Sequence, residues 1–325
     1  MAANLLEVNN LKTYFYTRSG VVKAVDDVTF SMKPGETLGV VGESGCGKSV
    51  TALSVMRLIS SPPGKIVQGE INFNGENILE KSMDELSDIR GSKISMIFQD
   101  PMTSLNPVFT VGYQIAETVK RHRKDVSNDQ AWRRAVEMLD LVRIPDAARR
   151  AKSYPHEFSG GMRQRVMIAI ALSCNPQLLI ADEPTTALDV TIQAQVLELM
   201  KGLSHEFGTA VMMITHDLGV VAGTCQRVNV MYAGHIIESA PVKQIFETPA
   251  HPYTIGLLQS IPRVDDSRGT RLTPIAGQPP DLINPPVGCP YAARCPRVQA
   301  RCRQELPELI QVGRGEQVAA CFYPN

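Results

Sequence analysis

Residues 38–49 are Leu38-Gly39-Val40-Val41-Gly42-Glu43-Ser44-Gly45-Cys46-Gly47-Lys48-Ser49. From Gly42 onward they fit the pattern G-x-x-x-x-G-K-[ST], whose glycines allow the left-handed turns that aim backbone N–H groups at a phosphate. The pattern lies between an apolar strand that ends at Val41 and a helical run that starts at Val50, as it requires. The helix N-terminus adds partial positive charge beside the loop. The stretch therefore predicts a nucleotide-phosphate loop in an α/β fold.

Apolar runs elsewhere in the chain favour the same fold class. Runs at residues 37–41, 93–98, 178–181 and 210–215 alternate with helical stretches, which is typical of a mainly parallel α/β sheet. Residues 107–174 interrupt this rhythm with helix-like segments and are predicted to form a helical insert.

Proline and cysteine are concentrated near the C-terminus, where 12 of the 22 prolines lie at or after Pro249 and four of the seven cysteines lie at 289–321. We therefore expect one domain at 1–250 and a second region of loops and short turns at 251–325.

Composition excludes several classes of protein. The 325 residues carry 33 Lys and Arg against 33 Asp and Glu, so the net charge is zero, which argues against a nucleic-acid partner. Hydrophobic residues at 43% and charged residues at 20% exclude disordered and fibrous chains. No apolar run approaches the roughly 18 to 20 residues that span a bilayer, and residues 1–6 lack the features of a secretory signal. We expect a cytosolic location.

Two adjacent carboxylates end a second apolar run, which is Leu178-Leu179-Ile180-Ala181-Asp182-Glu183-Pro184. Carboxylates at the end of a buried strand are costly unless they meet a metal ion or a proton. Asp182 is predicted to complete the shell of a Mg²⁺ ion and Glu183 to polarise the attacking water. Lys48 is expected to bridge the β- and γ-phosphates and Ser49 to hold Mg²⁺. The two motifs together predict nucleotide hydrolysis.

The segment Phe158-Ser159-Gly160-Gly161-Met162-Arg163-Gln164-Arg165 resembles the signature loop of ATP-binding cassette (ABC) proteins. Further marks of that family follow in order, namely Gln99 after a strand, Ala187-Leu188-Asp189 after the carboxylates, and His216 after the strand at 210–215. The resemblance implies an ABC-type P-loop nucleotide-binding domain with a helical subdomain at about 107–174. It also implies a dimer in which two cassettes enclose each ATP.

The resemblance further implies a role for each matching residue. Glu183, His216 and Gln99 are expected to be catalytic, with His216 on the γ-phosphate and Gln99 on the attacking water. Mg²⁺ is assigned to Ser49, Gln99 and Asp182. ATP is expected to contact Phe15, Gly42, Ser44, Gly45, Cys46, Gly47, Lys48, Ser49 and Val50, with Cys46 contributing only its backbone. The nucleotide of the partner cassette is assigned to Ser159, Gly160, Gly161 and Gln164, and Asp189 is placed at the dimer seam.

The aromatic platform for adenine lies shortly before the phosphate loop in such cassettes. Tyr14, Phe15 and Tyr16 all fall in that window, and stacking requires only the face of a ring. We select Phe15, with the alternative that any one of the three is a strand-core aromatic.

The C-terminal region resembles the tail of ABC ATPases that serve dipeptide and oligopeptide importers. The matching segments are His251-Pro252-Tyr253-Thr254, residues 277–282 and residues 285–295. This resemblance implies an ATPase subunit at the cytoplasmic face of the membrane that couples ATP hydrolysis to peptide uptake. Its expected partners are a second, different cassette, two transmembrane permease subunits and an external solute-binding protein.

Other functions are weighed against this one. Nickel and glutathione importers carry similar cassettes and remain alternatives. DNA-repair cassettes insert a long coiled-coil arm between phosphate loop and signature, whereas only 111 positions separate Lys48 from Ser159 here. A non-catalytic iron–sulfur sensor would leave the two carboxylates idle.

Four cysteines in the tail are spaced as C-x5-C-x6-C-x18-C, at Cys289, Cys295, Cys302 and Cys321. No pair shows the C-x2-4-C step that is common in structural zinc sites. Cys289 and Cys295 each precede a proline, as in the Cys-Pro element of ferredoxin-type sites, and four thiolates match the ligand count of a [4Fe–4S] cluster. We predict an iron–sulfur cluster, with zinc and free thiols or a disulfide as alternatives.

Overall fold

The computed structural model describes residues 4–100, 104–186, 188–260, 274–313 and 315–325. The chain divides into two compact units, which are described separately below. The first comprises Met1–Met32, Thr37–Leu79 and Thr215–Asn325, and the second comprises Lys33–Glu36 and Glu80–Ile214. The predicted boundary near residue 250 lies inside the first unit and stays a prediction. Within the described ranges, no helix has both the length and the apolar character needed to cross a bilayer.

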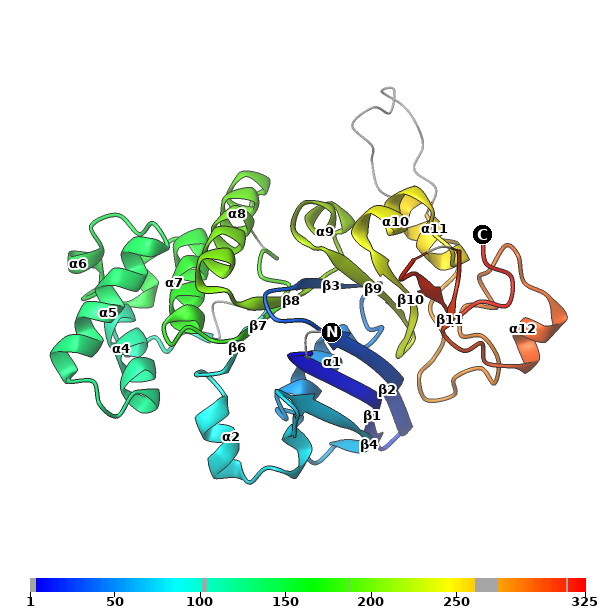
Figure 1. Ribbon diagram of the computed structural model, residues 1–325, viewed down its shortest axis with the longest axis horizontal. Coiled ribbons are helices and arrows are strands. Elements are labelled where there is room, and N and C mark those ends of the chain that lie inside the picture. The colour runs from blue at the N-terminus through cyan, green and yellow to red at the C-terminus, as the bar shows by residue number, and fades with distance from the viewer. Residues whose placement is uncertain (1–3, 101–103, 187, 261–273, 314) are drawn as a thin grey trace. The chain divides into compact units, whose positions relative to one another are not determined.

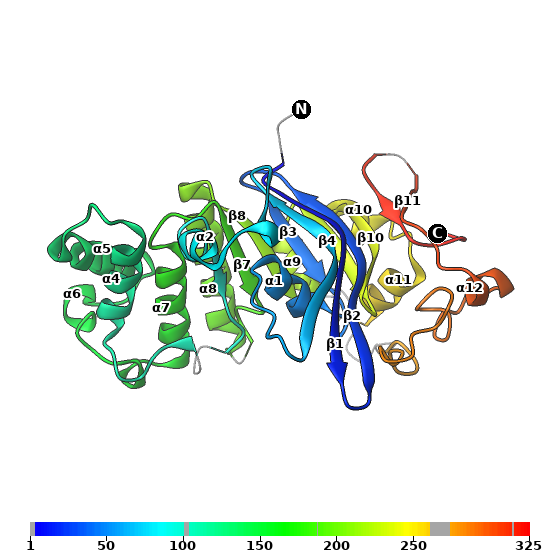
Figure 2. The same ribbon diagram turned by 90° about the horizontal axis from the view of Figure 1, so that it is seen from below.

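An antiparallel sheet of the order β2-β1-β4-β5 forms one layer of the first unit. Its strands are β1 (Leu6–Thr17), β2 (Gly20–Met32), β4 (Gly64–Phe73) and β5 (Glu76–Asn77). Leu6 and Val8 are fully buried alternate residues of β1, and after an irregularity in the pairing the alternation resumes with buried Leu11 and Thr13, as expected for a sheet with one covered face. Figure 2 shows β1 and β2 as two long neighbouring strands. The apolar runs of the sequence predict a mainly parallel sheet and do not predict this antiparallel layer.

The phosphate loop follows a strand of a second, mixed sheet in the same unit. Here β3 (Thr37–Val41) pairs in parallel with β9 (Arg227–Tyr232), and β10 (His235–Pro241) pairs antiparallel with β9. Short strands β12 (Val318–Ala319) and β11 (Ile310–Gln311) continue from β10. Strand β3 occupies the residues predicted for it, because an apolar run buried on both faces is stable in a parallel pairing. Helices of this unit include α1 (Lys48–Val55), α9 (Leu218–Thr224) and α10 (Val242–Glu247), and η1 (Ile78–Glu80) lies where its second stretch ends.

The predicted loops after residue 250 include a regular helix, α11 (Pro252–Gln259), so that part of the expectation was wrong. Proline at the first helical position supports the helix, because its missing N–H needs no partner there. His251 caps the helix, with Nδ1 accepting the Tyr253 N–H at 3.0 Å. A shorter helix, α12 (Ala300–Gln304), follows in the cysteine-rich segment.

The second unit carries three parallel strands and a group of helices. The strands are β6 (Ile94–Ile97), β7 (Leu178–Asp182) and β8 (Ala210–Thr215), which lie where apolar runs predicted them. Residues 111–172 hold α4 (Val111–His122), α5 (Asn128–Leu141), α6 (Ala147–Arg150), η2 (Pro155–Glu157) and α7 (Gly160–Leu172). Helices α2 (Met83–Ile89) and α8 (Val190–Phe207) also belong to the described part of this unit. Figure 1 shows α4, α5, α6 and α7 gathered side by side in green.

Candidate nucleotide-binding and hydrolysis site

Two positions of the phosphate loop, Gly42 and Gly47, have no room for a side chain. A Cβ on Gly42 would lie 2.1 Å from the carbonyl oxygen of Met231. Gly47 has φ +107° and precedes α1, and a Cβ there would lie 2.3 Å from the carbonyl oxygen of Ala24. Both contacts are with strand backbone, which cannot move aside easily. The loop therefore forms the tight cradle that a nucleotide phosphate requires.

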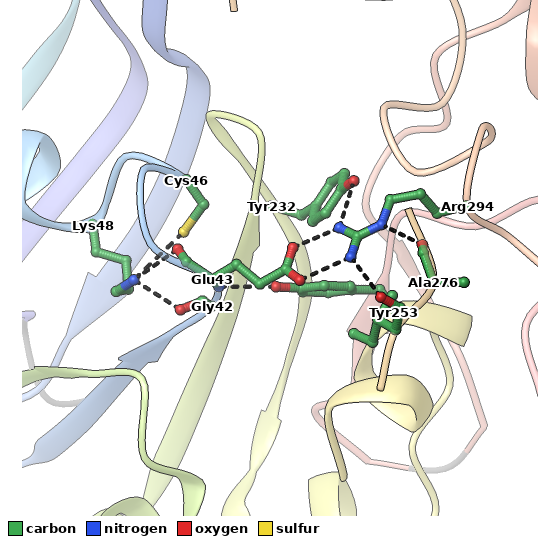
Figure 3. A network of polar contacts seen from close by, with 9 residues as sticks. Gly42, Glu43, Cys46, Lys48, Tyr232, Tyr253, Ala276 and Arg294 are labelled. Carbon is green, nitrogen blue, oxygen red and sulfur yellow. Dashed lines mark hydrogen bonds and ion pairs between the residues drawn. The ribbon is translucent and has the colours of Figure 1, made fainter. Parts of the chain in front are cut away.

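The lysine of the loop is held by the loop itself. Lys48 is only 5% exposed, and its Nζ donates to the carbonyl oxygens of Gly42 at 2.8 Å and Glu43 at 3.0 Å (Figure 3). The Cys46 thiol lies 3.8 Å from the same Nζ, and burial raises its pKa although the lysine opposes the shift. The ammonium group is thus desolvated and fixed beside the cradle. These features fit a bound polyphosphate.

The other residues assigned to ATP occupy the same loop and the start of α1. Ser44 and Gly45 are exposed, whereas Ser49 and Val50 are half-buried in the first turn of the helix. A hydroxyl in the first turn of α1 lies beside the cradle, which suits a ligand of a phosphate-bound Mg²⁺. The assignment of Gly42 to Val50 to one ATP site stays a prediction.

The second unit brings Gln99 and Glu183 together, although 84 residues separate them in the sequence. Gln99 Nε2 donates to Glu183 Oε2 at 3.0 Å, and Thr186 Oγ1 donates to the same oxygen at 2.9 Å. Glu183 adopts φ +46°, and its N–H donates to Ile214 at 2.9 Å. The geometry arises because β6 and β7 are parallel neighbours, so their carboxyl ends meet at one edge. Asp182, 5% exposed, ends β7 one residue earlier.

The signature segment forms the start of α7, as predicted for a serine and two glycines that open a helix. Ser159 is the N-cap, and its Oγ accepts the Met162 N–H at 3.4 Å. A Cβ on Gly161 would lie 2.6 Å from Ile192 Cγ2, so this glycine permits close packing of α7 on α8. Gln164 is 2% exposed, and its Nε2 has no hydrogen-bond partner within the described chain. Its assignment to a partner's nucleotide stays a prediction.

Asp189 and His216 are both exposed. Asp189 caps α8, with Oδ1 accepting the Ile192 N–H at 3.0 Å, a local function that sequence reasoning did not assign. His216 follows β8 directly and lies in the third stretch of the first unit, which begins at Thr215. Ala187, named with Asp189 in the family mark, lies outside the described residues.

The three candidate aromatics differ in their surroundings. Tyr14 donates its hydroxyl to Asp26 Oδ1 at 2.8 Å and lies under the Lys23 ammonium, 5.9 Å from the ring centre. Burial, assisted by the bond to Asp26, raises the pKa of Tyr14. Tyr16 is 52% exposed and Phe15 is half-buried. Tyr14 is therefore already engaged, and Phe15 stays our prediction for the adenine platform.

The four C-terminal cysteines line one small cavity of about 20 Å³, together with aromatic and proline side chains. Burial raises the pKa of Cys289 to about 11 and also raises the pKa values of Cys295 and Cys321. All four thiols therefore border one cavity, and their assignment to a metal group stays a prediction. Among the described residues, however, no three or more His, Cys, Asp or Glu side chains are arranged as a ready metal-binding group.

Comparison with known proteins decides the family. The ABC transporter model matches residues 25–186, and the model of the oligopeptide/dipeptide transporter C-terminal region matches residues 237–302. A probable peptide ABC transporter ATP-binding protein of Sinorhizobium fredii is 56% identical over 321 residues, 99% of this chain and 95% of that protein. The chain belongs to the ABC transporter ATPases with an oligopeptide/dipeptide transporter C-terminal region.

Other relatives of this ABC ATPase have similar coverage. The oligopeptide transport ATP-binding protein OppD of Salmonella typhimurium is 53% identical, covering 98% of this chain and 94% of the relative. The dipeptide transport ATP-binding protein DppD of Bacillus subtilis is 54% identical, covering 93% and 90%. A solved dimer of the cassette MJ0796 with ADP and Pi matches with TM-score 0.65 and 28% identity, covering 73% of this chain and 98% of that one. The expected cassette fold and ATPase class are confirmed.

Proposed function

We propose that this chain is the ATP-hydrolysing subunit of a membrane importer for dipeptides or oligopeptides. The observation that carries the proposal is the full-length similarity to peptide-transport ATPases, which includes the C-terminal region at 237–302. ATP hydrolysis by this chain then supplies the free energy for transport, and permease subunits form the path across the bilayer. We place it at the cytoplasmic face of the membrane, with two permeases, a second and different cassette, and an external solute-binding protein as partners.

In this proposal the phosphate loop and Lys48 bind the nucleotide, with Phe15 against adenine. Ser49, Asp182 and Gln99 are the groups that would hold Mg²⁺, which supplies charge neutralisation on the phosphates when bound. Glu183 accepts a proton from the attacking water, and the amide of Gln99, 3.0 Å away, orients its carboxylate. His216 holds the γ-phosphate. Ser159, Gly160, Gly161 and Gln164 serve the nucleotide of the partner cassette, and Asp189 lies at the seam.

We expect the isolated chain to hydrolyse ATP weakly, because each site lacks the partner's signature serine. Assembly with the second cassette and both permeases in lipid vesicles is expected to raise Mg²⁺-dependent turnover at least about tenfold. The measurement is phosphate release per chain, with and without peptide-loaded binding protein. Uptake of peptide, nickel or glutathione in the same vesicles identifies the solute class. Full activity in a proven monomer would contradict the two-cassette model.

We also propose that Cys289, Cys295, Cys302 and Cys321 hold a metal group that stabilises the Pro-rich C-terminal segment. The four cysteines line one cavity, which supports the proposal. A segment with little apolar core gains folding free energy from metal binding. A four-thiolate set with Cys-Pro steps favours a [4Fe–4S] cluster. Zinc is the alternative, and the small cavity would take a single ion with less displacement of the thiols.

Metal analysis of anaerobically purified protein tests this site. For the cluster, we expect a brown protein with about four iron atoms per chain. In Cys289→Ser the iron and the visible absorption are expected to be lost together. One zinc per chain in a colourless protein would instead support the zinc site and refute the iron–sulfur cluster. If the wild-type protein contains neither iron nor zinc, the proposed metal site is refuted and the ATPase assignment is unchanged.

A further inference from the structure

Glu43 places a negative charge inside the phosphate loop, one residue after Gly42. In Figure 3 its side chain points away from Lys48 and toward Arg294. The two form a bidentate ion pair, with Arg294 Nη1 at 2.6 Å and Nη2 at 2.9 Å from the two carboxylate oxygens. The Arg294 side chain is only 4% exposed and that of Glu43 is 27% exposed. This geometry is the strongest form of a carboxylate–guanidinium contact.

All three nitrogen atoms of the Arg294 guanidinium group make hydrogen bonds that hold it in place. Nη1 also donates to the Tyr232 hydroxyl at 3.2 Å, and the group lies 5.8 Å from the centre of that ring. Nε donates to the Ala276 carbonyl at 3.0 Å and Nη2 to the Ile275 carbonyl at 3.3 Å. Glu43 therefore meets a cation whose position is fixed before any nucleotide binds.

A second residue of the C-terminal region fixes the backbone of Glu43. The Glu43 N–H donates to the hydroxyl of Tyr253, in α11, at 2.9 Å. That helix is anchored in turn, because the buried Glu238 carboxylate accepts the N–H groups of Ala250 and His251 at 2.8 Å each. The family match at 237–302 thus covers three residues that act on the loop directly or through α11, namely Glu238, Tyr253 and Arg294.

The same region also lines the outer side of the loop. Pro279, Pro280 and Leu282 share a small cavity with Ser44 and Cys46. The Leu282 carbonyl accepts the Lys23 N–H of β2 at 3.0 Å, so this segment is tied to the sheet beside the loop. The loop is therefore supported by the C-terminal region at several points, all inside the first unit.

We propose that Arg294 is a positioning residue for nucleotide binding: it neutralises the Glu43 carboxylate and holds it away from the phosphates. An unpaired carboxylate in the loop would repel a polyphosphate. The repulsion would be stronger than in water, because the carboxylate is partly buried and its charge is less screened. The C-terminal region, which carries the arginine between Cys289 and Cys295, thereby sets the affinity of the phosphate loop. Arg294 acts through Glu43 and does not need to touch the nucleotide.

The test compares Arg294→Met, Glu43→Gln and the double variant in the full-length chain. ATP affinity is measured by titration of a fluorescent ATP analogue at low and high salt, with thermal unfolding alongside. We expect Arg294→Met to bind at least about tenfold more weakly, with a smaller loss at high salt. The double variant should recover most of the affinity, because the repelling charge is gone. In the assembled transporter, Arg294→Met should raise KM and leave kcat nearly unchanged.

Arg303→Met is the matched control, since it removes an exposed arginine from the same region and should not alter ATP affinity. If Arg294→Met does not fold, Glu43→Asp replaces it, because the shortened carboxylate keeps its charge but loses the bidentate contact and should also weaken binding. Unchanged affinity in these variants overturns the proposal, as does a loss that Glu43→Gln fails to restore. A wild-type chain that binds no ATP would instead refute the ATPase assignment.

Discussion

Replacing Glu183 by glutamine is expected to stop ATP turnover and leave ATP binding intact. Glutamine has nearly the same shape and keeps an oxygen that can accept from Gln99 and Thr186, which now donate at 3.0 and 2.9 Å. It cannot accept a proton from water, and the loss of a general base lowers rates by about 10² to 10⁴. The measurement is steady-state phosphate release in the assembled transporter together with ATP titration.

Glu198→Gln is the matched control for this experiment. Glu198 is an exposed carboxylate on α8 in the same unit, and its replacement should change neither turnover nor binding. Undiminished hydrolysis in Glu183→Gln would remove the assignment of Glu183. A parallel loss of binding would show instead that the carboxylate supports the nucleotide pocket.

Replacing Gly47 by alanine is expected to disrupt the phosphate loop. The added Cβ would meet the Ala24 carbonyl oxygen at 2.3 Å and Met231 Cε at 2.8 Å, at a residue with φ +107°. Ala24 lies in β2, where the sheet holds its backbone, so the loop must move. Strain and overlap together should lower the free energy of unfolding by about 3 kcal/mol or more and weaken ATP binding at least about tenfold.

Gly45→Ala separates the effect of that contact from the general cost of a left-handed residue. Gly45 has φ +79° and no atom within 4 Å of its ideal Cβ position. Its replacement should cost roughly 1 kcal/mol. Urea unfolding and ATP titration of both variants measure the difference. Equal losses in the two would mean that contact with Ala24 does not constrain the loop.

Much of the nucleotide chemistry could be predicted because it is encoded locally. The loop at 42–49 and the carboxylates at Asp182 and Glu183 depend on residues that are neighbours in the chain and on the strands that precede them. The start of α7 could also be predicted, since Ser159 is a favoured N-cap residue directly before a helical run. Short-range motifs of this kind retain their meaning without knowledge of the fold.

The antiparallel sheet and α11 were missed for different reasons. Strands β1, β2 and β4 pair over long stretches, but pairing is a non-local property that single-strand patterns do not specify. Helix α11 begins in a proline-rich stretch that suggested loops, and its cap depends on Glu238 from a different element. The helix therefore depends on the local cap of His251 and Pro252 together with the tertiary contact to Glu238.

The phosphate loop, the order of the ABC motifs and the resemblance to peptide-transport cassettes could be recognised in the sequence, because these depend on residue type and spacing. The pairing of Glu43 with Arg294, 251 residues away, and the cavity shared by the four C-terminal cysteines depend on the folded chain and could not be predicted from spacing. A variable position in a loop motif carries no sign of its partner. The effect of the Glu43 charge on the loop can be inferred only from the fold, which places the buried Arg294 beside it.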